Sequence, residues 1–110
     1  MRKLASVQKI LQLNPIEGKD RIELATICGW TCVVKKGDFQ VGDLCVFFEV
    51  DSVLPELPVF EFMRDRKFRV KTVKLGGQYS QGLALSLSAF EFDASLCVEG
   101  TDLTDVLVVS

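Results

Sequence analysis

The side chains best suited to chemistry in this sequence are the lysines and arginines of one short block. Residues 64–74 hold six basic side chains against one carboxylate, Asp65, which gives this block a charge of +5. Its basic residues are Arg64, Arg66, Lys67, Arg69, Lys71 and Lys74. Such a density of positive charge indicates a face that binds phosphate groups. A solvated strand edge that resists aggregation through its charges has the same composition, so this alternative stays open.

The basic block is notable because the whole chain of 110 residues has a net charge of −2. Residues 1–40 carry +3, residues 41–63 carry −5 and residues 75–110 carry −5. A strong local field in a chain that is acidic overall is typical of a binding face for a polyanion. We therefore expect the block, extended by Lys35 and Lys36, to form a positive surface.

Polar residues without any carboxylate follow the block. Gln78, Ser80 and Gln81 offer hydrogen bonds to phosphate or sugar, including a 2′-hydroxyl group. Tyr79, the only tyrosine, is either a stacking platform for a base or an aromatic ring packed into the turn after Gly76 and Gly77.

Several classes of chemistry are excluded or disfavoured. The chain has no histidine, which rules out acid–base catalysis or triads that use this residue. The four cysteines do not form paired short spacings, so we expect buried, reduced thiols and no metal site. No apolar run approaches the roughly 18 residues of a membrane span, and polar residues interrupt the N-terminal segment, so we do not expect a signal peptide there. We expect a soluble, intracellular protein without a membrane partner.

Hydrophobic periodicity predicts a mainly β domain. Residues 2–13 are assigned to a strand, residues 21–27 and 30–34 to a hairpin with its turn at Cys28-Gly29, and residues 44–50 to an alternating strand. Residues 51–65 suit one short helix with Phe60 and Phe62 in the core, and Trp30 is also expected there. Apolar residues fall at even positions first, Phe68 and Val70, and then at odd positions, Val73 and Leu75. The inward face of the strand therefore changes between them, which predicts a β-bulge near residues 71–72.

These elements favour a small closed barrel of about five strands, similar to an OB fold, with one short helix between strands three and four. An SH3-like barrel is the second fold compatible with the pattern. Neither fold assigns a function by itself.

Two long stretches are similar to a known family. "GKDRIELATICGWTCVVKKGDFQVGDLCVFFEVDSVLP" and "FRVKTVKLGGQYSQGLAL" resemble the N-terminal OB domain of the fifth family of ATP-dependent RNA ligases. The resemblance implies an RNA repair enzyme that joins RNA 3′-hydroxyl and 5′-phosphate ends, uses ATP with manganese or magnesium, and carries a nucleotidyltransferase domain after this one. The sequence departs from the family pattern at Gly76, where a basic residue is common, and at Ser86, where proline is more usual.

Residues 1–110 are accordingly expected to be a single OB domain, the N-terminal module of a longer ligase whose catalytic domain is absent. The nearest match to the K-x-D-G nucleophile loop is "KLGG" at Lys74, which lacks the acidic residue, so we expect no catalysis and no cofactor in this chain. The expected partners are RNA, as single-stranded ends or a nicked duplex, and the catalytic domain in cis. One alternative is a protein-interaction module whose face of residues 64–74 docks on the catalytic domain or on an acidic partner without direct RNA contact, with sensitivity at apolar surface positions such as Phe47. The other is a tRNA-binding OB module outside any ligase.

Overall fold

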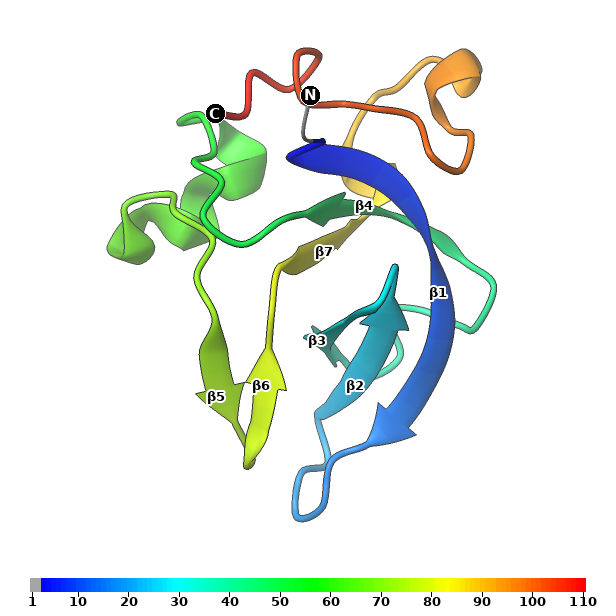
Figure 1. The fold of residues 1–110 in the computed structure, drawn as a ribbon, viewed down its shortest axis with the longest axis vertical. Coiled ribbons are helices and arrows are strands. Elements are labelled where there is room, and N and C mark those ends of the chain that lie inside the picture. The colour runs from blue at the N-terminus through cyan, green and yellow to red at the C-terminus, as the bar shows by residue number, and fades with distance from the viewer. Residues whose placement is uncertain (1–2) are drawn as a thin grey trace.

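A five-stranded antiparallel sheet organises residues 3–110, the part of the chain that the computed structural model describes (Figure 1). Its strands lie in the order β3-β2-β1-β4-β7, and a separate two-stranded sheet pairs β5 with β6. In chain order the elements are β1 (Ala5–Pro15), β2 (Ile22–Ile27), β3 (Trp30–Lys35), β4 (Leu44–Phe48), the 3-10 helix η1 (Pro58–Arg66), β5 (Val73–Leu75), β6 (Gln78–Ser80), β7 (Leu83–Ser86), and the 3-10 turns η2 (Leu87–Ala89) and η3 (Ala94–Leu96). The expected opening strand is confirmed as β1, and residue 2 of that prediction lies outside the described residues.

The long strand β1 gives the sheet its curvature. Its first half pairs with β4 and its second half pairs with β2, with a register shift between Ile10 and Gln12. Leu11, at the shift, is half exposed, as expected where an extra residue bends a strand. This bend lets one strand belong to both sides of a curled sheet.

Two tight turns follow directly from glycine positions. Cys28 and Gly29 join β2 to β3 with φ values of 50° and 81°, and Gly76 and Gly77 join β5 to β6 with 57° and 79°. Two consecutive residues with positive φ form the two-residue turn that matches the twist of a hairpin. Both predicted turns are confirmed by the ladders that flank them.

The alternating pattern of β4 separates two hydrophobic clusters. Cys45 and Phe47 pack with residues of β2 and β3, whereas Val46 and Phe48 pack with η1 and the C-terminal segment. Phe60 of η1 is fully buried and meets Phe48 edge to face, with ring centroids 5.5 Å apart. Packing of the β4 face that carries Val46 and Phe48 therefore holds η1 against the sheet.

The place of the helix differs from the expectation in one respect. η1 follows the fourth strand rather than the third, because β2, β3 and β4 are all separate strands before it. The prediction of a mainly β fold with about five strands in the main sheet and a short helix is confirmed. Within residues 3–110, no helix has both the length and the apolar character needed to cross a lipid bilayer.

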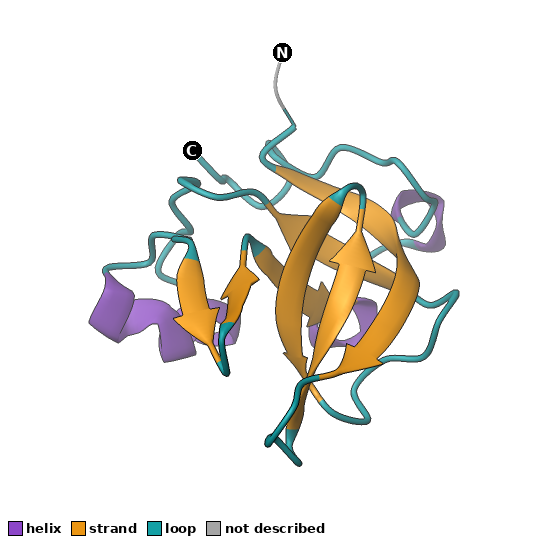
Figure 2. Ribbon diagram, turned by 60° about the horizontal axis from the view of Figure 1, so that its bottom comes forward, coloured by secondary structure: helices purple, strands orange, loops and turns teal. Residues whose placement is uncertain are grey.

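The prediction of a β-bulge near residues 71–72 is wrong, because the chain changes its strand-pairing partner there. Arg69 forms an isolated bridge with Val53, while Val73 pairs with Ser80 in the β5–β6 ladder. The parity of inward residues changes because the chain leaves one neighbour and joins another. The segment between residues 69 and 73 thus carries the chain from η1 to the projecting hairpin seen in Figure 2.

Hydrogen bonds from residues 79–81 hold the β5–β6 hairpin and the start of β7 against β3. The amide of Gln81 donates to the carbonyl of Thr31 at 2.8 Å, and the amide of Val33 donates to the hydroxyl of Ser80 at 2.8 Å. These contacts bridge the open edge of the curled sheet.

Candidate nucleic-acid interface

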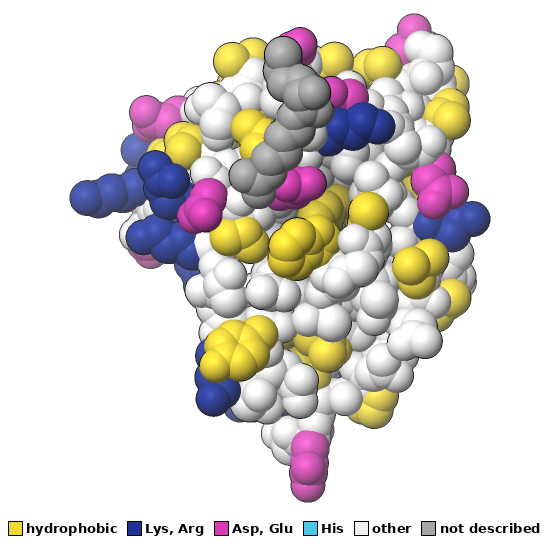
Figure 3. Space-filling model, in the orientation of Figure 1, with side chains coloured by type: hydrophobic (Ala, Val, Ile, Leu, Met, Phe, Trp, Pro, Cys, Tyr) yellow, Lys and Arg dark blue, Asp and Glu magenta, His cyan; other side chains and the backbone are white. Residues whose placement is uncertain are grey.

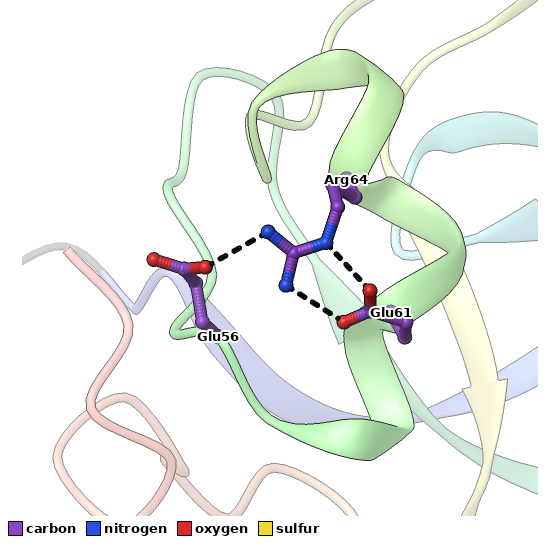
Figure 4. Close-up of polar contacts among 3 residues, drawn as sticks. All are labelled: Glu56, Glu61 and Arg64. Carbon is purple, nitrogen blue, oxygen red and sulfur yellow. Dashed lines mark hydrogen bonds and ion pairs between the residues drawn. The ribbon is translucent and has the colours of Figure 1, made fainter.

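The basic block divides into cations that are already neutralised and cations that are free. Arg64 belongs to the first group, because its guanidinium contacts the carboxylates of Glu61 and Glu56 (Figure 4). It donates to Glu56 at 3.1 Å and makes two hydrogen bonds to Glu61, one of them at 3.1 Å. The paired guanidinium lowers the pKa of Glu61, and these carboxylates raise the pKa of Arg64. Arg64 therefore braces η1.

Arg66, Lys71 and Lys74 belong to the second group. All three side chains are exposed, and within residues 3–110 no carboxylate lies at ion-pair distance from any of them. Basic side chains gather along the edge where Figure 1 places η1 and the β5–β6 hairpin (Figure 3). These cations can meet phosphate groups without first breaking an ion pair inside the protein.

Lys67 and Arg69 lie beside this group. Lys67 caps η1 in the left-handed conformation, with φ of 54°, and the buried Phe68 follows it with φ of 60°. Two consecutive left-handed residues other than glycine are uncommon, and they turn the chain sharply at the end of the helix. Arg69 is exposed, and its guanidinium donates at 3.5 Å to the backbone carbonyl of Asp51.

The polar residues in and after the β5–β6 hairpin differ in their exposure to solvent. Lys74 pairs with Tyr79 across the ladder, and its ammonium lies 5.5 Å from the centroid of the exposed tyrosine ring. Gln78 is exposed and Gln81 is half-buried. Ser80 is buried and its hydroxyl accepts from Val33, so the structure gives this residue a role in holding the sheet.

Tertiary contacts add basic residues that the sequence did not single out. A Cβ built on Gly76 would lie 3.2 Å from Cγ of Lys19, so the β1–β2 loop touches the hairpin tip. The predicted Lys35 and Lys36 lie at the end of β3, and the amide of Lys36 donates to the carbonyl of Arg21 at 2.8 Å. More than 50 residues of sequence separate Lys19 from Gly76, so no local pattern could have joined these groups.

A pocket of about 230 Å³ lies between η1, the β5–β6 hairpin and the start of β7. Val33, Val70 and Leu83 contribute to its apolar wall, while Arg66 and Lys71 line it with charge. Phe62 also lines the pocket.

Three expectations about aromatic side chains are corrected. Phe62 is 57% exposed rather than in the core, because Phe60 and Met63 supply the buried side of η1. Trp30 is 38% exposed, since it directly follows the β2–β3 turn. Phe47, named as a surface position for protein docking, is buried because both faces of β4 are covered.

The cysteines form no metal site in the described residues. Between residues 3 and 110 there is no cluster of three or more His, Cys, Asp or Glu side chains that could hold a metal ion. Cys32 and Cys45 are buried, as expected, whereas Cys28 is exposed in its turn and Cys97 is only partly buried. Burial, together with the neighbouring Cys32, raises the pKa of Cys45 to about 12. Burial also raises the pKa of Cys32.

Comparisons with known proteins agree with this architecture. A family model described as an OB-fold domain matches residues 4–87. Among curated proteins, none matches the chain. A structure of Naegleria gruberi RNA ligase with PPi matches 100% of this chain at 35% identity and a TM-score of 0.90.

Two further structures of the same ligase give similar values. A mutant with AMP and Mn matches 99% of this chain at 36% identity with a TM-score of 0.87, and an apo mutant matches 100% at 33% identity with a TM-score of 0.87. In all three cases the matched region is 35% of the ligase chain. The present chain thus spans about a third of the length of the proteins that it resembles.

Proposed function

Since this chain belongs to the OB-fold domain family, we propose that it is the accessory RNA-binding domain of an ATP-dependent RNA ligase. It corresponds to an N-terminal OB module that positions RNA ends for sealing by a nucleotidyltransferase domain in the rest of the ligase. The observation that carries this proposal is the similarity to Naegleria gruberi RNA ligase, at 35% identity over 100% of this chain but only 35% of the ligase.

The free cations provide the affinity in this proposal. Arg66, Lys71 and Lys74 meet backbone phosphates, and Lys67, Arg69, Lys35 and Lys36 extend the positive surface. Phosphate contacts fix the position and register of a nucleic acid without reading its sequence. The exposed ring of Tyr79 offers a platform for one base, and Gln78 and Gln81 donate to phosphate or sugar. The domain thereby contributes orientation of the RNA end rather than bond chemistry.

ATP and a divalent metal belong to the proposed parent enzyme. A Naegleria gruberi RNA ligase mutant has been solved with ATP and Mn. The residues of this chain do not fit such a centre, since residues 3–110 bring no three His, Cys, Asp or Glu side chains together. We therefore assign no step of nucleotide transfer to this domain.

Docking on the catalytic domain is the second candidate role, and the C-terminal segment favours it. Val106 and Val108 are 50% and 71% exposed, and an exposed apolar side chain gains free energy when a partner covers it. This role uses a surface distinct from the basic block. The two candidates therefore respond to different substitutions.

Fluorescence anisotropy with labelled single-stranded and nicked-duplex RNA across a salt series tests RNA binding. For single strands, the slope of log affinity against log salt falls by about 0.7 for each phosphate contact removed. Lys71→Ala and Lys74→Ala should each reduce the slope by about this amount. Lys9→Ala is the matched control, because Lys9 lies on β1 and pairs with Glu99 at 3.6 Å.

The outcomes separate the two roles. Reduced slopes for Lys71→Ala and Lys74→Ala, with an unchanged slope for Lys9→Ala, support RNA binding by the basic face. No salt-dependent binding by the unmodified domain would overturn the proposal. Docking on the catalytic domain through the exposed C-terminal valines would then be the remaining candidate role.

A further inference from the structure

The pocket beside η1 has the dimensions of a site for one ring system. Its volume is about 230 Å³, below the roughly 300–1,000 Å³ of sites that hold drug-sized ligands. Val33, Val70, Val73 and Leu83 provide apolar contacts from several elements that are distant in sequence. Because these elements belong to the packed sheet and its hairpin, the pocket is part of the fold.

An exposed aromatic side chain stands at this pocket. Phe62 is 57% exposed, whereas Phe60 on the same helix is fully buried. Phe62 and Arg66 are four residues apart in η1, and both line the pocket. A ring left in water beside an apolar hollow offers a face on which a second flat ring can stack.

The positive charge around the pocket favours a ring that belongs to a negatively charged ligand. Arg66 and Lys71 line it from two different segments, and neither has a carboxylate at ion-pair distance within residues 3–110. Arg64, only two residues before Arg66, is instead neutralised by Glu56 and Glu61. An uncharged apolar side chain from a protein partner would leave both cations without counter-charges. A nucleotide supplies a flat base for the hollow and phosphates for the cations.

We propose that this pocket receives one unstacked nucleobase of the bound RNA, stacked on Phe62, while the flanking phosphates contact Arg66 and Lys71. This inference rests on the proposed RNA binding and adds a defined subsite to it. It assigns Phe62 a role in affinity that is independent of charge. It also predicts that one nucleotide position in the RNA contributes more through its base than the others.

The test combines a protein substitution with removal of a base. Anisotropy is measured with a labelled single-stranded RNA of about 12 nucleotides, within the range covered by one OB fold, and with copies that each carry one abasic site. Phe62→Ala should weaken binding of the intact RNA about five-fold or more, the lower end of a stacking contribution. Its salt slope should stay unchanged because no phosphate contact is lost. Leu11→Ala, which removes a 49% exposed apolar side chain from β1, is the control.

Coupling between the two changes locates the base. An abasic site at one position should weaken binding to the unmodified domain by about the same factor as Phe62→Ala weakens binding of the intact RNA. The same abasic site should cause no further loss of affinity in the Phe62→Ala variant, since each change removes the same contact. The base pocket would be refuted if Phe62→Ala bound the intact RNA with unchanged affinity, or if each abasic site weakened binding equally in both proteins. RNA binding itself would still stand in that case, provided that the affinity depends on salt. Absence of any salt-dependent binding would refute both proposals together. Phe62 is exposed, so its replacement should leave the fold in place.

Discussion

Gly82 is the position where one added methyl group should damage the fold most. It links β6 to β7 with φ of +102°, and a Cβ there would lie 2.5 Å and 2.6 Å from ring atoms of Phe47 and 2.9 Å from the carbonyl oxygen of Phe48. Neither neighbour can move away easily, because Phe47 is 3% exposed and the oxygen belongs to the backbone of β4. Backbone strain of ~1–3 kcal/mol and overpacking of ~1–3 kcal/mol together predict that Gly82→Ala loses about 2–6 kcal/mol.

Urea unfolding followed by circular dichroism measures this loss. With a dependence on urea of about 2 kcal/mol per molar, the unfolding midpoint should fall by about 1–3 M. Gly100→Ala is the matched control, since Gly100 has φ of +91° and no atom lies within 4 Å of a Cβ built there. Gly100→Ala should lose only the part of the free energy of unfolding that comes from backbone strain. Equal losses for the two variants would show that contact with Phe47 and Phe48 does not control the stability at Gly82.

Two further predictions concern charge. Cys45→Ala should reduce the loss of folding stability at alkaline pH. Burial raises the pKa of this thiol to about 12 in the folded protein, whereas in the unfolded chain the pKa is about 9. The contribution of the thiol to the free energy of unfolding is therefore fully present below about pH 9, and it falls by up to ~1.4 kcal/mol per pH unit as the pH rises from about 9 toward 12. Urea midpoints in reducing buffer between pH 8 and pH 10.5 check this, and an equal slope in the variant would contradict it. Arg64→Ala should keep the salt slope of RNA binding, whereas Arg66→Ala should reduce it by about 0.7, because Glu56 and Glu61 already occupy the Arg64 guanidinium. A reduced slope in Arg64→Ala anisotropy titrations would show that RNA displaces these carboxylates.

The sequence was sufficient for features that depend on neighbours in the chain. Alternation along residues 44–48 predicts a strand whose two faces differ, and the structure places those faces in two separate clusters. The Cys28-Gly29 and Gly76-Gly77 pairs predict tight turns because glycine tolerates positive φ. The basic block and the resemblance to RNA ligase OB domains likewise required only the order of residues.

Local pattern could not decide which members of a set are available to a ligand. Arg64 and Arg66 have similar surroundings in the sequence, yet only Arg64 lies between two carboxylates. Ser80 resembles its polar neighbours, but the path of β3 makes its hydroxyl an internal acceptor. Phe62 matched the apolar pattern expected of a core residue, although the buried side of η1 is supplied by its neighbours.

The sequence by itself thus predicted the strands β1 to β4, two tight turns and the location of positive charge along the chain. The tertiary structure alone decided the contact of Lys19 with the hairpin tip, the pocket beside η1 and the exposure of Phe62. The physical reason is the range of the interactions involved. Backbone conformation responds mainly to adjacent residues, whereas burial, ion pairing and pocket shape depend on which distant segments the fold brings into contact.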